Sequence, residues 1–399
     1  MEPIPYSCQS ISEDDIESVA QVLRSSYLTQ GPEVELFESA MVARFHLKHA
    51  VCCSSGTAAL HLAYAAAGIS ENSMGFVPAV TFSATANAFR YLGAQVVFCD
   101  IVPETGLIDP ASLEECLDSC RLDSRALHAI TPVSFAGKVA PLAACRELAT
   151  AYGCKVIEDA SHSPGAFCRK GFGNDEISIT SPHCDASCLS FHPVKHICAG
   201  EGGALLTNDA EIAENAKNLR SHGITRPFSE NDAMPWYYQQ DKLGWNYRMT
   251  DLQAVLGRSQ LAKLEHSLLQ RRSIAQKYHQ AFSEEPFISH FHVPEPDEGH
   301  AWHLYVIRFI NQGVRDLAYK FLRERGIGSQ VHYIPLYRHP YYKNLLGEIH
   351  LPGAEAYFQS CLSIPMFPHL SEKQQDYVIQ TLSKFTENGS FYGRLQFTT

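Results

Sequence analysis

No stretch of the sequence is apolar for long enough to cross a membrane, so we expect no membrane-embedded part. Runs rich in lysine and arginine are missing, as are the aromatic motifs of RNA-binding domains, and we therefore expect no nucleic acid partner. The first residues are acidic and lack the basic and apolar regions of a signal peptide, which favours a cytoplasmic location. Charged residues make up only 19% of the chain, a proportion typical of globular proteins.

Cysteine, in contrast, is plentiful, with 13 residues in a chain of 399. In the cytoplasm these would be reduced thiols, and most lie in apolar segments where cysteine packs as a small hydrophobic residue. Cys184, Cys188 and His192 have the spacing of metal ligands and offer an alternative interpretation. Structural zinc usually takes its ligands from two separated pairs, and no second pair is found, so we expect no metal site.

Apolar strands alternate with helical segments from about residue 50 to residue 220. This alternation predicts an α/β fold with a mostly parallel, buried central sheet. The pattern then changes to one long amphipathic helix over 251–282, a strand over 303–309 and a helix over 314–326. We therefore expect a large α/β domain (1–250) that begins with a helical segment, followed by a linking helix and a small α+β domain (251–399).

Polar residues at the ends of the predicted strands are informative because ligands of such sheets gather at the carboxyl ends of the strands. The turn SSGT (Ser54–Thr57) lies between a strand and a helix, where backbone N–H groups can hold a phosphate. The same residues are also ordinary helix caps. Phe82, after the next strand, could stack on a flat ring or simply pack in the core.

Two acids, Glu158 and Asp159, end another apolar strand, and His162 follows three residues later. A carboxylate there must be solvated or paired with a cation, because burying it alone is very costly. A pyridinium nitrogen is one such cation, and a structural salt bridge is the alternative.

Lys195 lies in the stretch SFHPVKHICAGEGG, between Ser190 and a glycine-rich run. A partly desolvated lysine can form a Schiff base, Ser190 could hold a phosphate oxygen, and the glycines allow the backbone to approach closely. Taken together, the four strand ends supply a phosphate cradle, a ring stacker, a carboxylate and a lysine. Those are the groups that pyridoxal 5'-phosphate (PLP) requires.

These segments also resemble a known family in their order along the chain. SSGTAALHLAY, KVIEDASHSPGA, SFHPVKHICAGEGGALLTND and LGWNYRMTDLQAVLGRSQL are similar to segments of the DegT/StrS-type nucleotide-sugar aminotransferases, and the similarity covers most of the chain. The resemblance implies a PLP-dependent transferase of fold type I, the aspartate aminotransferase-like fold.

The resemblance also implies individual roles. Lys195 would form the Schiff base and move protons, Asp159 would pair with the pyridinium nitrogen, and His162 would lie near the ring's 3-hydroxyl. Asn246 would reach the cofactor phosphate of the other subunit, which implies a homodimer with shared active sites. The other cofactor contacts implied are Phe82 against the ring and Gly56, Thr57 and Ser190 at the phosphate.

Within the family, the chain most resembles the transaminases of pseudaminic acid synthesis. The implied reaction moves the amino group of L-glutamate to the 4-keto carbon of a UDP-linked 4-keto-6-deoxy-N-acetylhexosamine, in two half-reactions. Arg226 and Arg248 are candidates for binding the glutamate carboxylate. The residues implied at the sugar-nucleotide site are Tyr6, Ser26, Tyr27, Leu28, Thr29, Gln330, Val331, His332 and Tyr333.

Three alternatives stay open at this point. The substrate could be another 3- or 4-keto nucleotide sugar, of the perosamine or bacillosamine type. Some relatives are sugar dehydratases that carry histidine at the lysine position, and Lys195 disfavours that reaction. A non-catalytic sensor that binds PLP or a nucleotide sugar is the third alternative, and the presence of Lys195, Asp159 and Asn246 argues against it.

Overall fold

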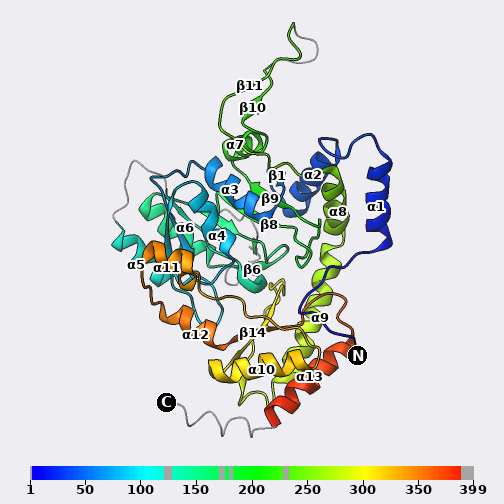
Figure 1. Cartoon of the computed structure of the whole chain (residues 1–399), viewed down its shortest axis with the longest axis vertical. Coiled ribbons are helices and arrows are strands. Elements are labelled where there is room, and N and C mark those ends of the chain that lie inside the picture. Colours follow the sequence, from blue (N-terminus) through cyan, green and yellow to red (C-terminus); the bar gives the residue numbers. More distant parts are fainter. Residues whose placement is uncertain (1, 121–127, 170–175, 179–182, 228–232, 388–399) are drawn as a thin grey trace.

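The computed structural model describes residues 2–120, 128–169, 176–178, 183–227 and 233–387. A helix-covered central sheet and a smaller sheet are joined by two consecutive helices, α8 (Asp251–Ala262) and α9 (Leu264–Phe282) (Figure 1). None of the helices in these ranges is both long and apolar enough to span a bilayer. The polar end of the chain, from residue 388, lies outside the described residues.

Within the described residues, the central sheet has seven strands in the order β1-β9-β8-β5-β4-β2-β3. All pair in parallel except β9, which runs antiparallel to both of its neighbours. The predicted α/β fold is thus confirmed. The strands are β1 (His49–Cys53), β2 (Met74–Pro78), β3 (Gln95–Cys99), β4 (His128–Ile130), β5 (Cys154–Asp159), β8 (Ala186–Ser190) and β9 (Gly203–Thr207).

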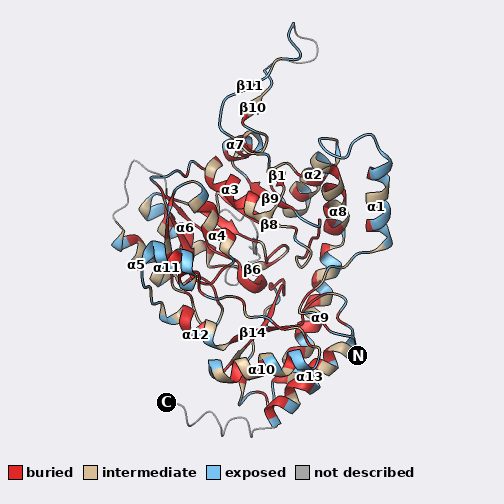
Figure 2. Cartoon of the chain, in the orientation of Figure 1, coloured by how far each residue is buried: buried red, intermediate tan, exposed pale blue. Residues whose placement is uncertain are grey.

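Both faces of this sheet are buried, because alternate side chains of each strand enter different hydrophobic clusters (Figure 2). In β1, for example, Val51 and Cys53 pack on one side, while Ala50 and Cys52 pack on the other. The helices around the sheet are α2 (Glu33–Phe45), α3 (Gly56–Ala66), α4 (Ser83–Tyr91), α5 (Pro110–Ser119), α6 (Leu142–Tyr152) and α7 (Ala210–Arg220).

The smaller sheet is antiparallel and consists of β12 (Phe291–His292), β13 (Tyr305–Phe309) and β14 (Cys361–Ile364). Its core includes Ile4, whose backbone pairs with Ile327, so the start of the chain lies beside the C-terminal part. The domain boundary near residue 250 stays a prediction. The helices of this part, apart from α9, are α10 (Gln312–Glu324), α11 (Pro340–Leu346), α12 (Pro352–Ser360) and α13 (Glu372–Glu387).

The single helix predicted over 251–282 is wrong, because the chain leaves helical geometry at Lys263 (φ −100°, ψ 2°). Lys263 extends its ammonium group to Asp15 (2.5 Å) and Ser12 (2.7 Å), at the start of α1 (Glu13–Arg24). This contact joins residues far apart in the sequence, so no local sequence pattern predicts it.

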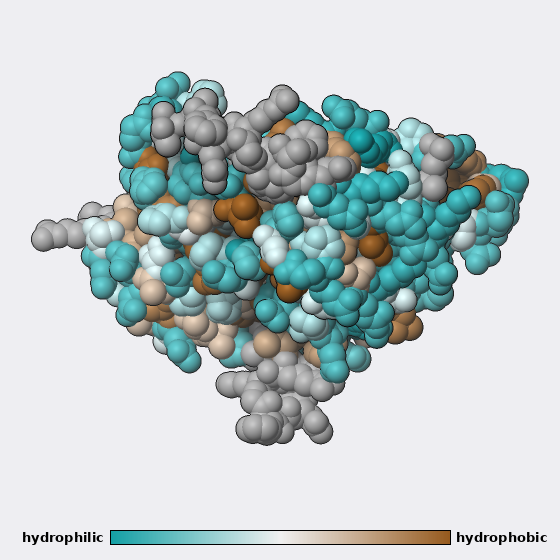
Figure 3. Space-filling view, turned by 90° about the horizontal axis from the view of Figure 1, so that it is seen from below, coloured by the Kyte–Doolittle hydropathy of each residue, from teal (hydrophilic) through white to brown (hydrophobic). Residues whose placement is uncertain are grey.

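Two short hairpins complete the fold: β6 (Phe167–Arg169) with β7 (Glu176–Ser178), and β10 (Ile224–Thr225) with β11 (Gln239–Gln240). The second projects from the top of the molecule in Figure 1 and exposes Trp236 and Tyr238, which lie between its two strands. The opposite side, seen in Figure 3, is largely hydrophilic outside its grey atoms and shows only small, separate hydrophobic areas.

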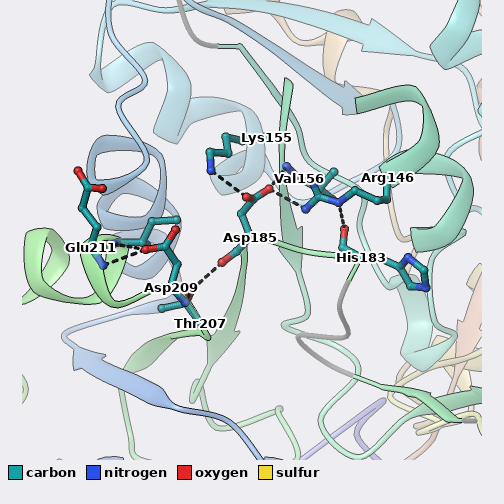
Figure 4. Close-up of polar contacts among 9 residues, drawn as sticks. Arg146, Lys155, Val156, His183, Asp185, Thr207, Asp209 and Glu211 are labelled. Atoms are coloured by element: carbon teal, nitrogen blue, oxygen red, sulfur yellow. Dashed lines mark hydrogen bonds and ion pairs between the residues drawn. The ribbon is translucent and has the colours of Figure 1, made fainter. Parts of the chain in front are cut away.

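A polar network fixes the beginning of β8, the strand that ends at Ser190 (Figure 4). The Asp185 carboxylate accepts hydrogen bonds from Arg146 (2.7 Å), Lys155 (2.9 Å) and the Val156 amide (2.8 Å). Burial alone would raise the pKa of Asp185, but these donors outweigh it and lower the pKa. Thr207 of β9 donates to the Asp185 carbonyl at 2.6 Å, so the network ties β5, β8 and β9 together.

Candidate active site

A pocket of about 690 Å³ lies at the carboxyl ends of the parallel strands. The turns after β1 and β2, the ends of β5 and β8, and an extended segment over 330–333 all contribute to it. The central sheet therefore supplies one side of the pocket, and the C-terminal part supplies the other.

Most of the residues predicted for the site meet in this pocket. The predicted residues that line it are Tyr6, Gly56, Thr57, Phe82, Asp159, His162, Ser190, Lys195, Gln330, Val331, His332 and Tyr333. Sequence reasoning missed Ser161, His192 and Glu201 as lining residues, although each lies within six residues of a predicted one. Their spacing to Lys195 and Asp159 could have identified them.

Ser26–Thr29 and Asn246 do not line this pocket. The loop over 26–29 is exposed, and its Thr29 pairs with Thr250. The amide of Asp251 donates to the Leu28 carbonyl at 3.0 Å. The loop thus lies beside the segment that carries Asn246, which is also exposed.

The turn before α3 forms a narrow cradle. The Ser55 hydroxyl caps the helix by accepting the Ala58 amide at 3.1 Å, while the amides of Gly56 and Thr57, in the first turn, have no partner within the helix. A Cβ on Gly56 would lie 2.7 Å from the Ser190 Cβ, so only glycine lets this turn approach the end of β8. Both predictions for the turn are thus compatible, since the cap leaves amides available to an anion.

Asp159 is 5% exposed, yet it forms no ion pair with any described side chain. Among the described residues, its carboxylate accepts from the Thr85 hydroxyl (2.8 Å) and the Ser161 amide (3.1 Å). The neighbouring Glu158 instead meets the hydroxyls of Ser134 (2.5 Å) and Ser187 (2.7 Å). A buried carboxylate without an ion-pair partner fits a protonated ring nitrogen in the pocket.

Lys195 follows β8 in a turn, and its amide donates to the His192 carbonyl at 2.8 Å. Desolvation in the pocket lowers the pKa of its amine to about 8, although the Asp159 carboxylate acts in the opposite direction. About a tenth of the amine is therefore neutral at pH 7, far more than for an ordinary lysine, and the neutral form is the one that acts as a nucleophile.

Two rings flank the space between these groups. Phe82 is 59% exposed, and its ring centroid lies 6.2 Å from that of Tyr333. His162 is buried, and its Nδ1 accepts the Ala136 amide at 3.3 Å. A phosphate cradle, an unpaired carboxylate, a partly neutral lysine and flanking rings together fit PLP.

The alternative metal ligands do not meet. Cys188 packs among the core side chains on one side of the sheet, and Cys184 packs on the other. His192 is exposed at the pocket. Among the described residues, no group of three or more histidine, cysteine, aspartate or glutamate side chains is arranged to hold a metal ion.

The candidates for the donor carboxylate lie elsewhere as well. Arg226 extends over the ring of Tyr238, with 6.0 Å between its guanidinium carbon and the ring centroid. Arg248 is half-buried, and neither arginine lines the pocket.

Solved structures place this fold in a class. The aminotransferase PseC of Helicobacter pylori, involved in the biosynthesis of pseudoaminic acid, superposes with a TM-score of 0.86 at 29% identity, over 97% of this chain and 100% of that one. Spr1654 of Streptococcus pneumoniae, solved in its PLP form, superposes with a TM-score of 0.84 at 26% identity, over 96% and 99%. The fold is that of the PLP-dependent aminotransferases of type I.

Sequence comparison narrows the class to a family. Residues 9–383 match the DegT/DnrJ/EryC1/StrS aminotransferase family, and the chain belongs to this family. A UDP-4-amino-4,6-dideoxy-N-acetyl-beta-L-altrosamine transaminase of Campylobacter jejuni is 36% identical over 386 residues, 96% of this chain and 98% of that protein. The chain is thus an aminotransferase, and its cofactor is PLP.

Proposed function

We propose that the chain transfers the amino group of L-glutamate to the 4-keto carbon of a UDP-linked 4-keto-6-deoxy-N-acetylhexosamine, in pseudaminic acid or related sugar biosynthesis. The observation that carries the proposal is the meeting of Lys195, Asp159 and the Gly56 cradle in a single pocket. The sugar is proposed from the full-length similarity to the Campylobacter transaminase and to PseC.

PLP, when bound, would supply an aldehyde that carries the amino group from one half-reaction to the other and a ring that accepts electrons. In its neutral form, the Lys195 Nζ takes the α-proton of the amino donor and returns a proton in the reverse sequence. The Asp159 carboxylate holds the ring nitrogen protonated. The amides of Gly56 and Thr57, with the Ser190 hydroxyl, bind the phosphate.

The extended segment that carries Gln330 and Val331, together with Tyr6, would bind the sugar nucleotide at the open side of the pocket. His332 and Tyr333 follow Val331 directly in the chain and would line the same part of the pocket. Because the sugar must approach the cofactor from solvent, these residues are the ones that can discriminate between keto sugars.

We further propose a homodimer with shared active sites. Ser26–Thr29 and Asn246 lie outside their own chain's pocket, and the projecting hairpin exposes large aromatic side chains. A second chain could supply Asn246 to the phosphate and the 26–29 loop to the nucleotide. Measurement of the mass in solution, with titration of cofactor in Asn246→Ala, tests this arrangement.

The test of the reaction is product analysis with glutamate and a panel of UDP- and dTDP-linked 3- and 4-keto sugars. We expect amination at C4 of the UDP-linked 6-deoxy-N-acetylhexosamine, with parallel lines in double-reciprocal plots and no turnover by Lys195→Ala. Preferred turnover of a perosamine- or bacillosamine-type precursor would replace the proposed sugar. Full turnover by Lys195→Ala would refute the mechanism.

The sensor alternative is separated by one spectrum. Glutamate added to the PLP-loaded enzyme should convert the cofactor's absorbance to that of its amino form, without any sugar. An absorbance that glutamate leaves unchanged would favour a sensor that binds without turning over.

A further inference from the structure

Behind His162 lies a loop with unusual backbone geometry, residues 300–304, which we call the 300–304 loop. Trp302 has a left-handed φ of 50°, and Ala136, which faces this loop, has a φ of 57°. The two segments approach so closely that a Cβ on Gly137 would lie 2.7 Å from the backbone nitrogen of Trp302. Left-handed backbone is costly for residues other than glycine, so the surrounding contacts must hold it in place.

Several contacts hold the 300–304 loop. The amides of Ala301 (2.8 Å) and Leu304 (3.1 Å) donate to the carbonyls of Gly137 and Ala136, respectively. The Nε2–H of His196, the residue after Lys195, donates to the Ala301 carbonyl at 2.8 Å. The loop is therefore connected directly to the turn that carries the lysine.

A buried cation also binds the loop. Arg271 of α9 is 1% exposed and donates to the carbonyls of Trp302 (2.9 Å) and Met366 (3.2 Å). Arg271 forms no ion pair with any described carboxylate. A buried arginine whose described partners are all carbonyls is costly to bury, and these hydrogen bonds fix the position of the loop.

The loop presents the ring of His303 to His162. The two imidazoles stack with 4.2 Å between their centroids and an interplanar angle of 28°. Because the Ala136 amide donates to Nδ1 of His162, this nitrogen carries no proton, and the proton of the neutral ring is on Nε2. His162 lines the pocket, so this N–H is the group it offers there.

The surroundings also keep the His162 ring neutral. Burial lowers the pKa of His162 well below its ordinary value, and the positive charge of Lys195 and the rings of His332 and His196 act in the same direction. The titratable groups that face His162 from the elements packed against it are Lys195, His196, His303, His332 and Tyr333.

We propose that His303 is a positioning residue whose stacked ring holds His162 where its Nδ1 accepts the Ala136 amide, which keeps the Nε2–H tautomer and aims that N–H at the 3-oxygen of the cofactor. The aim at the cofactor rests on the proposed function of the pocket, whereas the tautomer and the stacking belong to the protein alone. A neutral donor stabilises the negative oxygen of the ring without adding a second positive charge beside Lys195.

Two variants of His303 separate positioning from simple core filling. His303→Phe keeps a flat ring without nitrogen atoms, and His303→Leu fills a similar volume without a flat face. The ¹⁵N spectrum of histidine-labelled, cofactor-free protein reports the tautomer and charge of His162. His128, which likewise accepts a backbone amide at its Nδ1 (3.0 Å, from Met74) far from the pocket, serves as the reference in the same spectrum.

We expect His162 of the wild type and of His303→Phe to stay in the Nε2–H form and not to titrate between about pH 5 and 8. In His303→Leu, His162 should become a mixture of tautomers with a higher pKa, while His128 stays unchanged. An unchanged His162 in a folded His303→Leu protein would overturn the proposal.

The loaded enzyme gives a second reading. His303→Leu should shift the pH titration of the cofactor's absorbance and lower kcat about 10- to 100-fold with little change in the KM for the sugar, and His303→Phe should restore both. If the tautomer changes in the cofactor-free protein but the cofactor's titration does not, the positioning stands and the proposed role of His162 in the pocket is wrong. If His303→Leu and His303→Phe do not differ in the tautomer of His162 or in the kinetics and cofactor titration of the loaded enzyme, His303 only fills the core and the inference is refuted.

Discussion

Two aspartates stand at opposite ends of the same pair of strands, β5 and β8, and their surroundings differ sharply. Asp185, before β8, accepts from Arg146, Lys155 and the Val156 amide, so its charge is neutralised within the protein. Asp159, at the end of β5, is buried with two uncharged donors and forms no ion pair with any described side chain. The first carboxylate is satisfied by the fold, whereas the second awaits a ligand.

The comparison shows how a fold separates stability from function. The ion pairs at the start of β8 fix the register of the strands. This role is structural and does not depend on the function of the protein. At the carboxyl ends the fold keeps a carboxylate and a desolvated lysine unpaired, which costs stability and prepares the pocket for a cationic ring and a reactive carbonyl. Removal of Asp159 should therefore affect catalysis, whereas removal of Asp185 should affect stability.

The largest expected effect is on catalysis. Asp159→Asn removes the anion that holds the ring nitrogen protonated, and we expect kcat to fall about 10²- to 10³-fold. Asp185→Asn should leave kcat per folded molecule unchanged. Steady-state kinetics of the two purified variants measure this directly. Equal losses of kcat would show that the two aspartates do not differ in role.

A second change narrows the cradle at the functional end. In Gly56→Ala the new Cβ would lie 2.7 Å from the Ser190 Cβ, so the turn must shift away from β8. We expect the dissociation constant of PLP to rise about tenfold or more, because the phosphate loses well-placed amides. Fluorescence titration with PLP measures it. Gly153→Ala, outside the pocket, places a Cβ with nothing within 4 Å at a strained left-handed φ of 70°, so it controls for a general loss of stability without a change in the cradle.

At the structural end, Asp185→Asn should lower the free energy of unfolding by about 2 kcal/mol, since charge-assisted hydrogen bonds are lost. The folded-state pKa of Asp185 is lowered from 3.8, so its contribution is fully present above about pH 5 and is lost as the pH falls through the lowered pKa. Urea unfolding of wild type and variant across this range should show the difference shrinking in acid. A difference independent of pH would contradict the ion-pair account.

The smallest expected effect concerns the stability that the protein loses by burying the amine of Lys195. Because the pKa of Lys195 is lowered from 10.5 to about 8, the unfolded chain binds more protons between these values, and wild-type stability rises with pH there. Lys195→Met should therefore stabilise the cofactor-free protein at neutral pH, and this gain should vanish as the pH approaches 10.5. A gain that persists at high pH would show that the lysine charge is not its cause.

The same contrast explains what the sequence could reveal. Lys195 and Asp159 were predictable because each follows an apolar strand, and strand ends meet at one edge of the sheet. The break at Lys263 was not, because its cause is the distant Asp15. His303 carried no local signal either, since its importance arises from a stack on a ring more than a hundred residues away in the sequence.

Residues 128–137 illustrate the same limit at a smaller scale. Here β4 ends at Ile130, and the chain then turns through the left-handed Ala136 towards the 300–304 loop. Contacts with the C-terminal part decide that turn. This turn and the 300–304 loop are thus fixed by contacts between the two parts of the chain, which no local pattern shows.

The most direct test is the thermal shift that saturating PLP produces in Asp159→Asn and Asp185→Asn, measured beside the wild type. We predict that Asp159→Asn without cofactor is at least as stable as the wild type but loses most of the PLP-induced rise in Tm. Asp185→Asn should melt lower without cofactor and keep the full rise. If Asp159→Asn instead melts as low as Asp185→Asn and keeps the full rise with PLP, the carboxylate at the end of β5 does not await the cofactor, and the account is wrong.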